Sequence, residues 1–210
     1  MEDIILVGGG GHCKSVIDTI INSNLYNIYG IIDVKKNIGK EVCGIKVIDC
    51  DENLSIYREK GIKNAFITLG SIGNTSIRRN LYELLIKNGF EIPRIIDKTS
   101  IVSDRAIIDS GVFVGKGSII NVDSKIGKNS IINSGSIIEH DCILEEFVHI
   151  SPGVTLCGGV KIGENSHIGA NSTIIQFKNI GENVIIGAGS IVVKDINSNT
   201  KAFGNPCRER

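Results

Sequence analysis

Histidine is the side chain that most readily gains or loses a proton near neutral pH, and this chain has only four histidines. They are His12, His140, His149 and His167. Asp141 follows His140 directly, so its carboxylate could orient the imidazole or hold its proton. We expect His140 to act as a general base. The alternative is a surface histidine that hydrogen-bonds to a neighbouring segment.

The histidines of the second half of the chain could also bind a metal ion. Three imidazoles that met between subunits could hold zinc. Carboxylates near them could then support the ligands: Glu139, Asp141, Glu145 and Glu146. The six cysteines are scattered and form no CxxC pair, which favours free thiols in a reducing cytosol over a zinc motif or a disulfide framework. We therefore expect a cytoplasmic protein without a metal site.

A glycine-rich loop follows the first apolar run of the chain. Residues 4–7 are apolar, residues 8–11 are all glycine, and residues 14–21 have the spacing of an amphipathic helix. The N–H groups of such a loop and of the helix that follows it suit a phosphate group. The dinucleotide-binding fingerprint is not met, because Cys13 or Lys14 stands where its third glycine would be. The loop predicts a phosphate or nucleotide ligand, with a tight turn that binds nothing as the alternative.

Other polar residues follow the predicted strands of the same region. Asp33 ends the apolar run at residues 28–32, and Gly70 and Ser71 end the run at residues 65–69. Ligands of open α/β sheets bind at the carboxyl ends of the strands. His12 and Lys14 could contact the phosphates, and Asp33 could accept hydrogen bonds from a ribose or a base. The residues predicted to bind the phosphate or nucleotide are Gly10, Gly11, His12, Lys14, Asp33, Gly70 and Ser71.

The second half of the chain has a six-residue period. Every sixth residue from Val102 to Val192 is Ile, Leu or Val. This period fits neither a helix nor an ordinary strand, and it is typical of a parallel β-helix. We expect the aliphatic residue to point into the interior. Gly or Asn often follows it, as at Gly115 and Asn121, and we expect this position to form a corner with unusual φ/ψ angles.

Three hexads make one three-sided coil, so residues eighteen apart should stack about 4.8 Å from one another. His140 then lies over Gly158, whose N–H is a candidate donor to an oxyanion, and His149 lies over His167. We expect His140 on a flat side of the coil and the other two histidines at a corner. They can converge only if a second copy of the chain supplies one of them, which predicts a composite site in a cyclic trimer. Two solvated corner histidines are the alternative.

Net charge and the length of the apolar runs limit the kinds of partner that this chain could bind, and the sequence patterns predict two domains. The 210 residues carry a net charge of +0, so no nucleic acid or polybasic membrane contact is expected. No apolar run approaches the roughly 18 residues of a membrane span. We predict a small Rossmann-like α/β domain with a parallel sheet at residues 1–93. Residues 94–210 are predicted to form a parallel β-helix followed by a short tail.

Three segments match a known family: residues 5–12, residues 140–153 and residues 204–206. With the hexads, they make the chain resemble the hexapeptide-repeat acyltransferases with a left-handed β-helix. Within these it is similar to the sugar acetyltransferases of the sialic acid O-acetyltransferase and bacillosamine-pathway N-acetyltransferase group. The chain departs from the pattern where other residues replace the usual glycine of the hexad: Glu139, Glu145, Cys157 and Ile175. This puts the shape of those coils in doubt.

The resemblance implies a homotrimer that binds acetyl-CoA in the groove between adjacent β-helices. It implies that His140 is the base, that Asp141 is its acidic neighbour, and that Gly158 contacts the acetyl carbonyl. The catalytic residues would be His140, Asp141 and Gly158. The acetyl-CoA-binding residues would be His149, Gly158, His167, Ala170, Ile185, Asn205 and Pro206. In members that act on nucleotide sugars, the glycine loop and Asp33 would hold the nucleotide.

These observations predict an N-acetyltransferase that moves an acetyl group from acetyl-CoA to a nucleotide-linked amino-deoxy sugar, a reaction of surface glycan biosynthesis. No metal is expected to take part. A sialic acid O-acetyltransferase is the main alternative, but a free sugar acceptor has no use for a nucleotide site. A non-catalytic scaffold and a metal-dependent enzyme similar to the γ-class carbonic anhydrases are more distant alternatives, because the same repeat is used by both.

Overall fold

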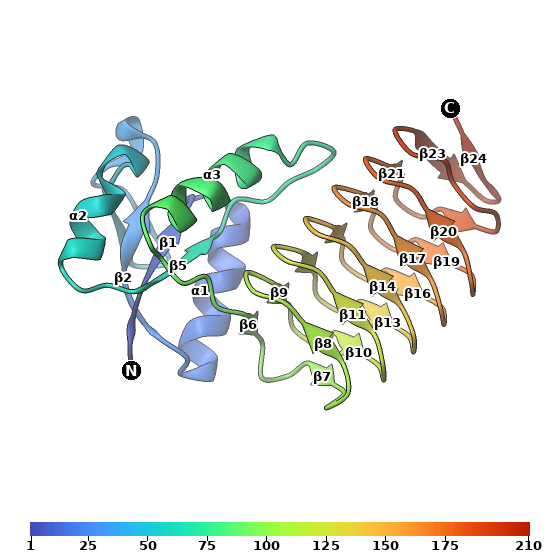
Figure 1. Cartoon of the computed structure of the whole chain (residues 1–210), viewed down its shortest axis with the longest axis horizontal. Coiled ribbons are helices and arrows are strands. Elements are labelled where there is room, and N and C mark those ends of the chain that lie inside the picture. The colour runs from blue at the N-terminus through green and yellow to red at the C-terminus, as the bar shows by residue number, and fades with distance from the viewer. The chain divides into compact units, whose positions relative to one another are not determined.

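The computed structural model describes all 210 residues, which divide into two compact units. The first unit comprises Met1–Ser71 and Ser76–Ile95, and the second comprises Ile72–Thr75 and Ile96–Arg210. Figure 1 shows the helices and sheet of the first unit, and it shows the second unit as a stack of coils. None of the helices has the length and apolar character that a bilayer crossing requires.

The first unit is built on a five-stranded sheet with the strand order β3-β4-β2-β1-β5. Its three apolar runs form β1 (Asp3–Val7), β2 (Asn27–Ile32) and β5 (Asn64–Ile67), and β1 pairs in parallel with the other two. Ile4, Ile5 and Leu6 are completely buried, as expected for a central parallel strand. The predicted small parallel α/β sheet is confirmed.

Three helices complete this unit: α1 (Gly11–Ser23), α2 (Leu54–Glu59) and α3 (Ser76–Lys87). The 3-10 turns η1 (Lys35–Asn37) and η2 (Asp51–Asn53) lie in the connections. Apolar residues have helical spacing at residues 14–21 and also at residues 75–87, where Ile77, Leu81, Leu84 and Leu85 form one stripe, and this spacing predicts α1 and α3. The sequence did not predict α2 or the edge strands β3 (Glu41–Val42) and β4 (Ile45–Asp49). These two strands are antiparallel to each other, and β4 extends the sheet by pairing in parallel with β2.

The second unit is a left-handed parallel β-helix whose short strands form three sheets. Each coil of eighteen residues contributes one strand to each sheet in turn. Sheet I contains β7 (Ile101–Val102), β10 (Ile119–Ile120), β13 (Ile137–Ile138), β16 (Thr155–Leu156), β19 (Thr173–Ile174) and β22 (Ile191–Val192). Sheet II contains β8 (Ile107–Ile108), β11 (Lys125–Ile126), β14 (Ile143–Leu144), β17 (Lys161–Ile162) and β20 (Asn179–Ile180).

Sheet III is the longest of the three because the chain ends on it. It contains β6 (Ile95–Ile96), β9 (Phe113–Val114), β12 (Ile131–Ile132), β15 (His149–Ile150), β18 (His167–Ile168), β21 (Ile185–Ile186), β23 (Lys201–Gly204) and β24 (Cys207–Glu209). β23 and β24 are antiparallel, and the turn between them holds the cis peptide bond that joins Asn205 to Pro206. The left-handed winding is an exception to the usual right-handed crossover between parallel strands.

The register confirms the predicted stacking of residues eighteen apart. Ile119 pairs with Ile137, and His149 pairs with His167. The second residue of each strand points inward, and from Ile108 onward these residues are buried in one continuous core. The departures from the family pattern do not disturb the coils: Glu139 N–H donates to Leu156 and Cys157 N–H donates to Ile174, both at 3.0 Å.

A second buried column consists of the small residue that lies two places before each inward residue. Serine takes this position in many coils, including Ser118 and Ser124, and both are fully buried. Their hydroxyls donate to main-chain carbonyls of the next coil, Ser118 to Asn133 at 2.8 Å and Ser124 to Glu139 at 2.7 Å. Because each buried hydroxyl has a partner, these serines stabilise the interior rather than weaken it.

The prediction of unusual φ/ψ angles directly after the inward residue is wrong. Gly115 and Asn121 do not have positive φ, and the left-handed residues lie two places further on, as at Gly117 and Asp123. The glycines after the inward residue are needed for space instead. A Cβ at Gly115 would lie 2.9 Å from the backbone nitrogen of Ser134 in the next coil.

Gly163→Ala should therefore destabilise the β-helix. The added Cβ would lie 2.6 Å from the backbone nitrogen of Glu182, and overpacking of this kind costs about 1–3 kcal/mol. Gly135→Asn is the matched control, because Gly135 has φ +68 with open space around it and asparagine tolerates this conformation. We expect thermal unfolding to show a lower Tm for Gly163→Ala and little change for the control. Equal Tm values for the two variants would contradict the steric explanation.

Candidate active site

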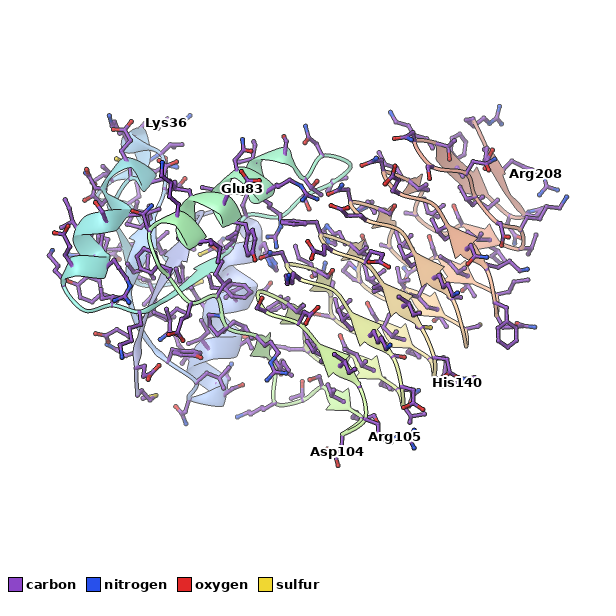
Figure 2. The ribbon with its side chains drawn as sticks, in the orientation of Figure 1. Lys36, Glu83, Asp104, Arg105, His140 and Arg208 are labelled. Carbon is purple, nitrogen blue, oxygen red and sulfur yellow. The ribbon has the colours of Figure 1, made fainter.

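His140 lies in the turn between β13 and β14, at the corner where sheet I meets sheet II. We call this the I/II corner. The prediction that His140 lies on a flat side of the coil is therefore wrong, because the strand ends two residues earlier, at Ile138. Figure 2 shows His140 along the same edge of the β-helix as Arg105, which occupies the same corner two coils earlier.

Asp141 holds the His140 ring by a hydrogen bond between Nδ1 and Oδ2 at 2.8 Å. Adjacent residues of a strand point to opposite faces, but Asp141 has φ +60, and this tight turn brings the two side chains together. When the proton on Nδ1 bonds the carboxylate, Nε2 presents its lone pair. Both side chains are more than half exposed, so a reactant can reach Nε2 from solvent.

Gly158 lies directly under the imidazole, as the spacing predicted. A Cβ at this position would lie 2.5 Å from both Cε1 and Nε2 of His140. Only glycine leaves room for the ring there. The next residue, Gly159, donates its N–H to the carbonyl of His140 at 2.9 Å, whereas the Gly158 N–H takes no part in the hydrogen bonds between these coils. A base and a backbone donor therefore lie one coil apart at the same corner.

The buried thiol beside this pair is not a candidate nucleophile. Cys142 is fully buried two residues after His140, and its Sγ–H donates to the carbonyl of Cys157 at 3.3 Å. Burial raises the pKa of the Cys142 thiol to about 11, so almost none of it is thiolate at neutral pH. Cys142 is therefore not suited to form a covalent thioester with the acyl group.

His149 and His167 lie on the flat face of sheet III, not at a corner as predicted. They begin β15 and β18, and their rings meet edge to face with centroids 4.8 Å apart. Asn133 and Ser151 were not predicted to belong to this group. The Asn133 amide nitrogen lies 2.8 Å from His149 Nε2, and Ser151 Oγ lies 3.4 Å from His167 Nε2. Both come from the position directly after an inward residue, which the sequence suggested only as a corner.

His167 is a neutral group under ordinary conditions. It is 7% exposed, and its Nδ1 has no hydrogen-bond partner. Burial, together with the nearby His149, lowers the pKa of His167 to about 4. It therefore cannot serve as a base near neutral pH in the way that the exposed His140 can.

One chain cannot bring the two groups of histidines together. The three sheets form a triangular prism, and the I/II corner is the edge opposite sheet III. His140 therefore points away from the face that carries His149 and His167. Within one chain, no three side chains of His, Cys, Asp or Glu gather as a set of metal ligands.

The other residues predicted to bind acetyl-CoA follow sheet III and its margin. Ile185 pairs with His167 in the next coil, Ala170 lies in the turn after β18, and Asn205 and Pro206 form the turn of the terminal hairpin. Segment Ile72–Thr75 also belongs to this unit. A Cβ at Gly73 would lie 2.5 Å from Cδ1 of Ile185, and Thr75 donates to Asn165 at 2.6 Å.

The residues predicted to bind the nucleotide lie at the carboxyl ends of β1, β2 and β5. Helix α1 begins at Gly11, and its N-cap Gly10 provides no side chain to cap the first N–H groups. A Cβ at either position would meet nothing within 4 Å, so a ligand can approach these donors closely. Asp33 Oδ2 accepts from Gly9 N–H at 3.2 Å, which fixes the carboxylate beside the loop.

A pocket of about 230 Å³ opens at this edge of the sheet. Its lining combines Asp33 and Gly8 with apolar side chains from β1, β2 and α3, and the full set is Val7, Gly8, Ile32, Asp33, Val34, Asp51, Leu69, Ile77 and Leu81. Lys14 and His12 do not line this pocket. A Cβ at Gly70 would lie 3.8 Å from Cβ of His12, so these two predicted residues are close neighbours. Ser71, which follows Gly70, is buried.

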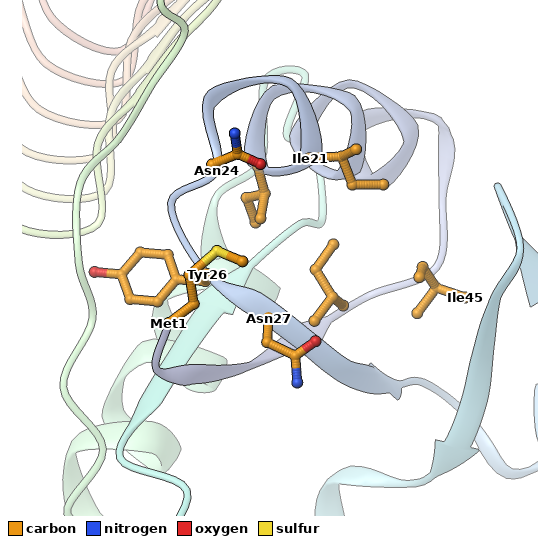
Figure 3. Close-up of a pocket in the computed structure, with 8 residues that line it drawn as sticks. Met1, Ile21, Asn24, Tyr26, Asn27 and Ile45 are labelled. Carbon is orange, nitrogen blue, oxygen red and sulfur yellow. The ribbon is translucent and has the colours of Figure 1, made fainter.

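Figure 3 shows a separate pocket of about 230 Å³ in the same unit. It lies at the end of α1 and the beginning of β2, between Ile21, Tyr26 and Ile45. None of the predicted ligand-binding residues lines it. Because it is at the amino end of β2, it is not where ligands of open α/β sheets bind.

Arg78 supports the main chain at the carboxyl end of β5, and the sequence did not predict this role. It is 2% exposed in α3, and its guanidinium donates to the carbonyls of Ile67 and Leu69 at the end of β5. Burial lowers the pKa of Arg78 to about 10, which still leaves it charged at neutral pH. It therefore holds the main chain from which Gly70 and Ser71 follow.

The chain matches models of known families along most of its length. The PglD N-terminal domain matches residues 3–85. The bacterial transferase hexapeptide (six repeats) matches residues 123–158 and 141–176, and the hexapeptide repeat of succinyl-transferase matches residues 159–194.

Solved structures match both units together. A histidine-to-asparagine variant of perosamine N-acetyltransferase from Caulobacter crescentus, in complex with CoA and GDP-perosamine, is 31% identical with a TM-score of 0.94. The match covers 100% of this chain and 97% of that chain. The acetyltransferase domain of PglB from Neisseria gonorrhoeae FA1090, in complex with acetyl coenzyme A, is 31% identical with a TM-score of 0.90. This match covers 100% of this chain and 99% of the PglB domain.

The chain belongs to the hexapeptide-repeat acyltransferases. Within them it is a sugar N-acetyltransferase that combines a PglD-type N-terminal domain with a β-helix, as the resemblance in the sequence implied. WeeI from Acinetobacter baumannii AYE, at 23% identity and a TM-score of 0.79 over 100% of both chains, shares the fold.

The low pKa of His167 should make folding stability depend on pH. A histidine in the unfolded chain titrates near 6.5, but folded His167 titrates at about 4. Between these values the unfolded state binds a proton that the folded state does not. The free energy of unfolding should therefore fall as the pH drops from about 6.5 to about 4, by roughly 2–3 kcal/mol from this group. Above that range, the contribution of His167 is constant.

Chemical denaturation of wild type and His167→Gln across this pH range measures the effect. The variant lacks the titrating group, so its stability should fall less steeply on acidification. All carboxylates are common to both proteins, so the difference between the two curves isolates His167. Parallel curves would mean that the pKa of His167 is the same in the folded and unfolded protein.

Proposed function

We propose that this enzyme transfers an acetyl group from acetyl-CoA to the amino group of a nucleotide-linked amino sugar, with His140 as the general base. The observation that carries this proposal is the stacking of the His140 imidazole over the Gly158 backbone. The solved relatives support the substrate class, since one is in complex with CoA and GDP-perosamine and another with acetyl coenzyme A.

His140 Nε2 removes the proton of the amine as its nitrogen attacks the thioester carbonyl. Asp141 keeps the proton of the free base on Nδ1 and stabilises the imidazolium that forms. The protonated ring can then give its proton to the departing thiolate of coenzyme A. The acetyl group moves in one transfer from sulfur to nitrogen, and coenzyme A leaves as the thiol.

The Gly158 N–H stabilises the oxyanion of the tetrahedral intermediate. Its place one coil from the base allows one reacting carbon to lie near both groups. A fixed backbone donor needs no reorganisation during the reaction, which makes such groups effective in acyl transfer.

The acyl-donor site is composite, and its two walls come from adjacent subunits of a homotrimer. The I/II corner of one copy supplies His140, Asp141 and Gly158. Sheet III of the next copy supplies His149, His167, Ala170, Ile185, Asn205 and Pro206. This pairing of two different surfaces is a heterologous contact, which closes into a ring in a cyclic trimer. The half-buried apolar row on sheet I, which includes Ile119, Ile137 and Ile191, is suited to the same interface.

The α/β unit, which we assign to residues 1–93, binds the nucleotide of the acceptor. The phosphates bind the N–H groups of Gly10 and Gly11 at the start of α1, with His12, Lys14, Gly70 and Ser71 around them. Asp33 accepts hydrogen bonds from the ribose or the base in the pocket that it lines. Residues 94–210 hold the acyl-transfer site. The cytoplasm is the proposed location, because it keeps thiols reduced and all six cysteines are free.

His140→Ala should lower kcat about 10²- to 10⁴-fold, the usual contribution of general base catalysis, with little change in the KM of either substrate. Asp141→Asn should lower kcat by a smaller factor. The release of coenzyme A, followed with a thiol reagent, measures both. Asp123→Asn is the matched control, because Asp123 has the same turn conformation one coil earlier and only forms an exposed salt bridge with Arg105. Wild-type turnover by His140→Ala would refute the base assignment.

Asp33→Ala should weaken nucleotide binding by at least about tenfold, because it removes the acceptor that faces the pocket. Thermal shift with UDP, dTDP, GDP and CMP measures binding to wild type and identifies the nucleotide. A ligand at 100 times its Kd stabilises the protein by about 2.7 kcal/mol. Asp18→Ala on the exposed side of α1 is the control and should bind normally. Unchanged nucleotide affinity in Asp33→Ala would place the nucleotide elsewhere.

A further inference from the structure

Phe177 places a bulky side chain at a turn position whose backbone conformation is unfavourable for it, and the fold does not require phenylalanine there. It is the third residue after an inward residue. This position recurs every six residues, and it has positive φ in every hexad from Gly111 to Gly189. All but two of these residues are Gly, Asn or Asp, which tolerate the left-handed region. The exceptions are Phe147 at φ +57 and Phe177 at φ +56. Bulky side chains are rare in this conformation, which is unfavourable for them.

The two phenylalanines differ in what their rings do. Phe147 is 2% exposed, so the burial of its ring offsets the unfavourable backbone conformation. Phe177 is 69% exposed, and it gains little from packing within the chain. An unfavourable backbone conformation that no packing within the chain offsets is typical of functional sites.

The Phe177 ring lies at the I/II corner, which also carries His140 and Gly158. A Cβ at Gly159 would lie 2.6 Å from Cδ1 and 2.8 Å from Cε1 of this ring. The Phe177 N–H donates to the carbonyl of Gly158 at 3.0 Å. The turn formed by Gly158 and Gly159 is thus covered from two sides. The His140 ring covers Gly158 from the coil before, and the Phe177 ring covers Gly159 from the coil after (the His140 edge is seen in Figure 2).

We propose that the Phe177 ring is the apolar wall against which the thioester end of the acyl donor packs. This inference rests on the proposed function, in which the acetyl carbonyl accepts from the Gly158 N–H. The thioester sulfur and the methylene group next to it are one and two bonds from that carbonyl. Neighbouring coils are about 4.8 Å apart, so a ring over Gly159 is within van der Waals reach of these atoms.

The chemistry of the two surfaces is complementary. The sulfur and the first methylene groups of the pantetheine arm are weakly polar, and sulfur packs favourably against aromatic rings. Contact with the donor would bury the ring and keep water from the thioester. Phe177 would thereby bind and position the donor, while His140 and Gly158 carry out the transfer.

Phe177→Asn tests this directly, because asparagine occupies the equivalent turn position at Asn165 and Asn171. We expect the KM for acetyl-CoA to rise about tenfold, as expected for losing part of an aromatic contact, with the KM for the nucleotide sugar unchanged. The Tm should stay the same or rise, because the backbone conformation suits asparagine. Phe177→Leu, which keeps an apolar group, should have an intermediate KM. Ile56→Asn removes an exposed apolar side chain from α2 and is the control.

Titration calorimetry with coenzyme A should give the same order of affinities. An active Phe177→Asn enzyme with unchanged KM for acetyl-CoA, or with a raised KM for the nucleotide sugar alone, would overturn the inference and leave the proposed function intact. Dissociation of this variant into monomers on size-exclusion chromatography would assign Phe177 to a subunit contact instead, and would also overturn the inference. A wild-type protein that releases no coenzyme A would refute the proposed function itself.

Discussion

The eighteen-residue register of the β-helix is the constraint on which the rest of the second unit depends. Parallel pairing at this spacing places each residue over its equivalent in the next coil, so one short motif builds whole columns. It produces the continuous aliphatic interior and the column of buried serines that donate to the next coil. It also brings His140 over Gly158, although neither residue takes part in the packing of the interior. An insertion of one residue between them would keep a β-helix in part but separate the proposed base from the proposed donor.

The sequence predicted the columns correctly and their position around the coil incorrectly. The six-residue period identifies which residues share a column, because it depends only on spacing. It does not identify the turn. Glycine after the inward residue looked like a corner signal, but it is required because the next backbone comes within 2.9 Å of where its Cβ would be. The left-handed turn lies two residues further along, at positions such as Asp141 and Gly159. For this reason His140, which was predicted on a flat side, lies at a corner, and His149, which was predicted at a corner, lies on a flat side.

In the α/β unit, local signals predicted the loops at the carboxyl ends of the strands but not the residues of α3 that pack beside them. The glycine loop and Asp33 can be recognised from the sequence because each directly follows an apolar run. Ile77 and Leu81 of α3 line the pocket that Asp33 also lines, although α3 is far along the chain from Asp33. Their spacing alone indicates only one face of an amphipathic helix. Arg78 lies beside them on the same helix. A charged residue is expected at the surface, yet it is buried because its guanidinium finds the carbonyls at the end of β5.

The electrostatic contrast between the two walls fits an acyl transfer in which one group handles the proton. His140 and its carboxylate partner are in contact with solvent, so the imidazolium formed in the proposed mechanism would be hydrated and paired. On sheet III, burial lowers the pKa of His167 to about 4, which keeps this histidine from taking up a proton near neutral pH. In the proposed composite site, His167 therefore does not compete with His140 for the amine proton. A second imidazole that could be charged beside the thioester would compete for that proton and repel the imidazolium of His140. His167 adds nothing to this competition, because its burial disfavours the charged form of the imidazole.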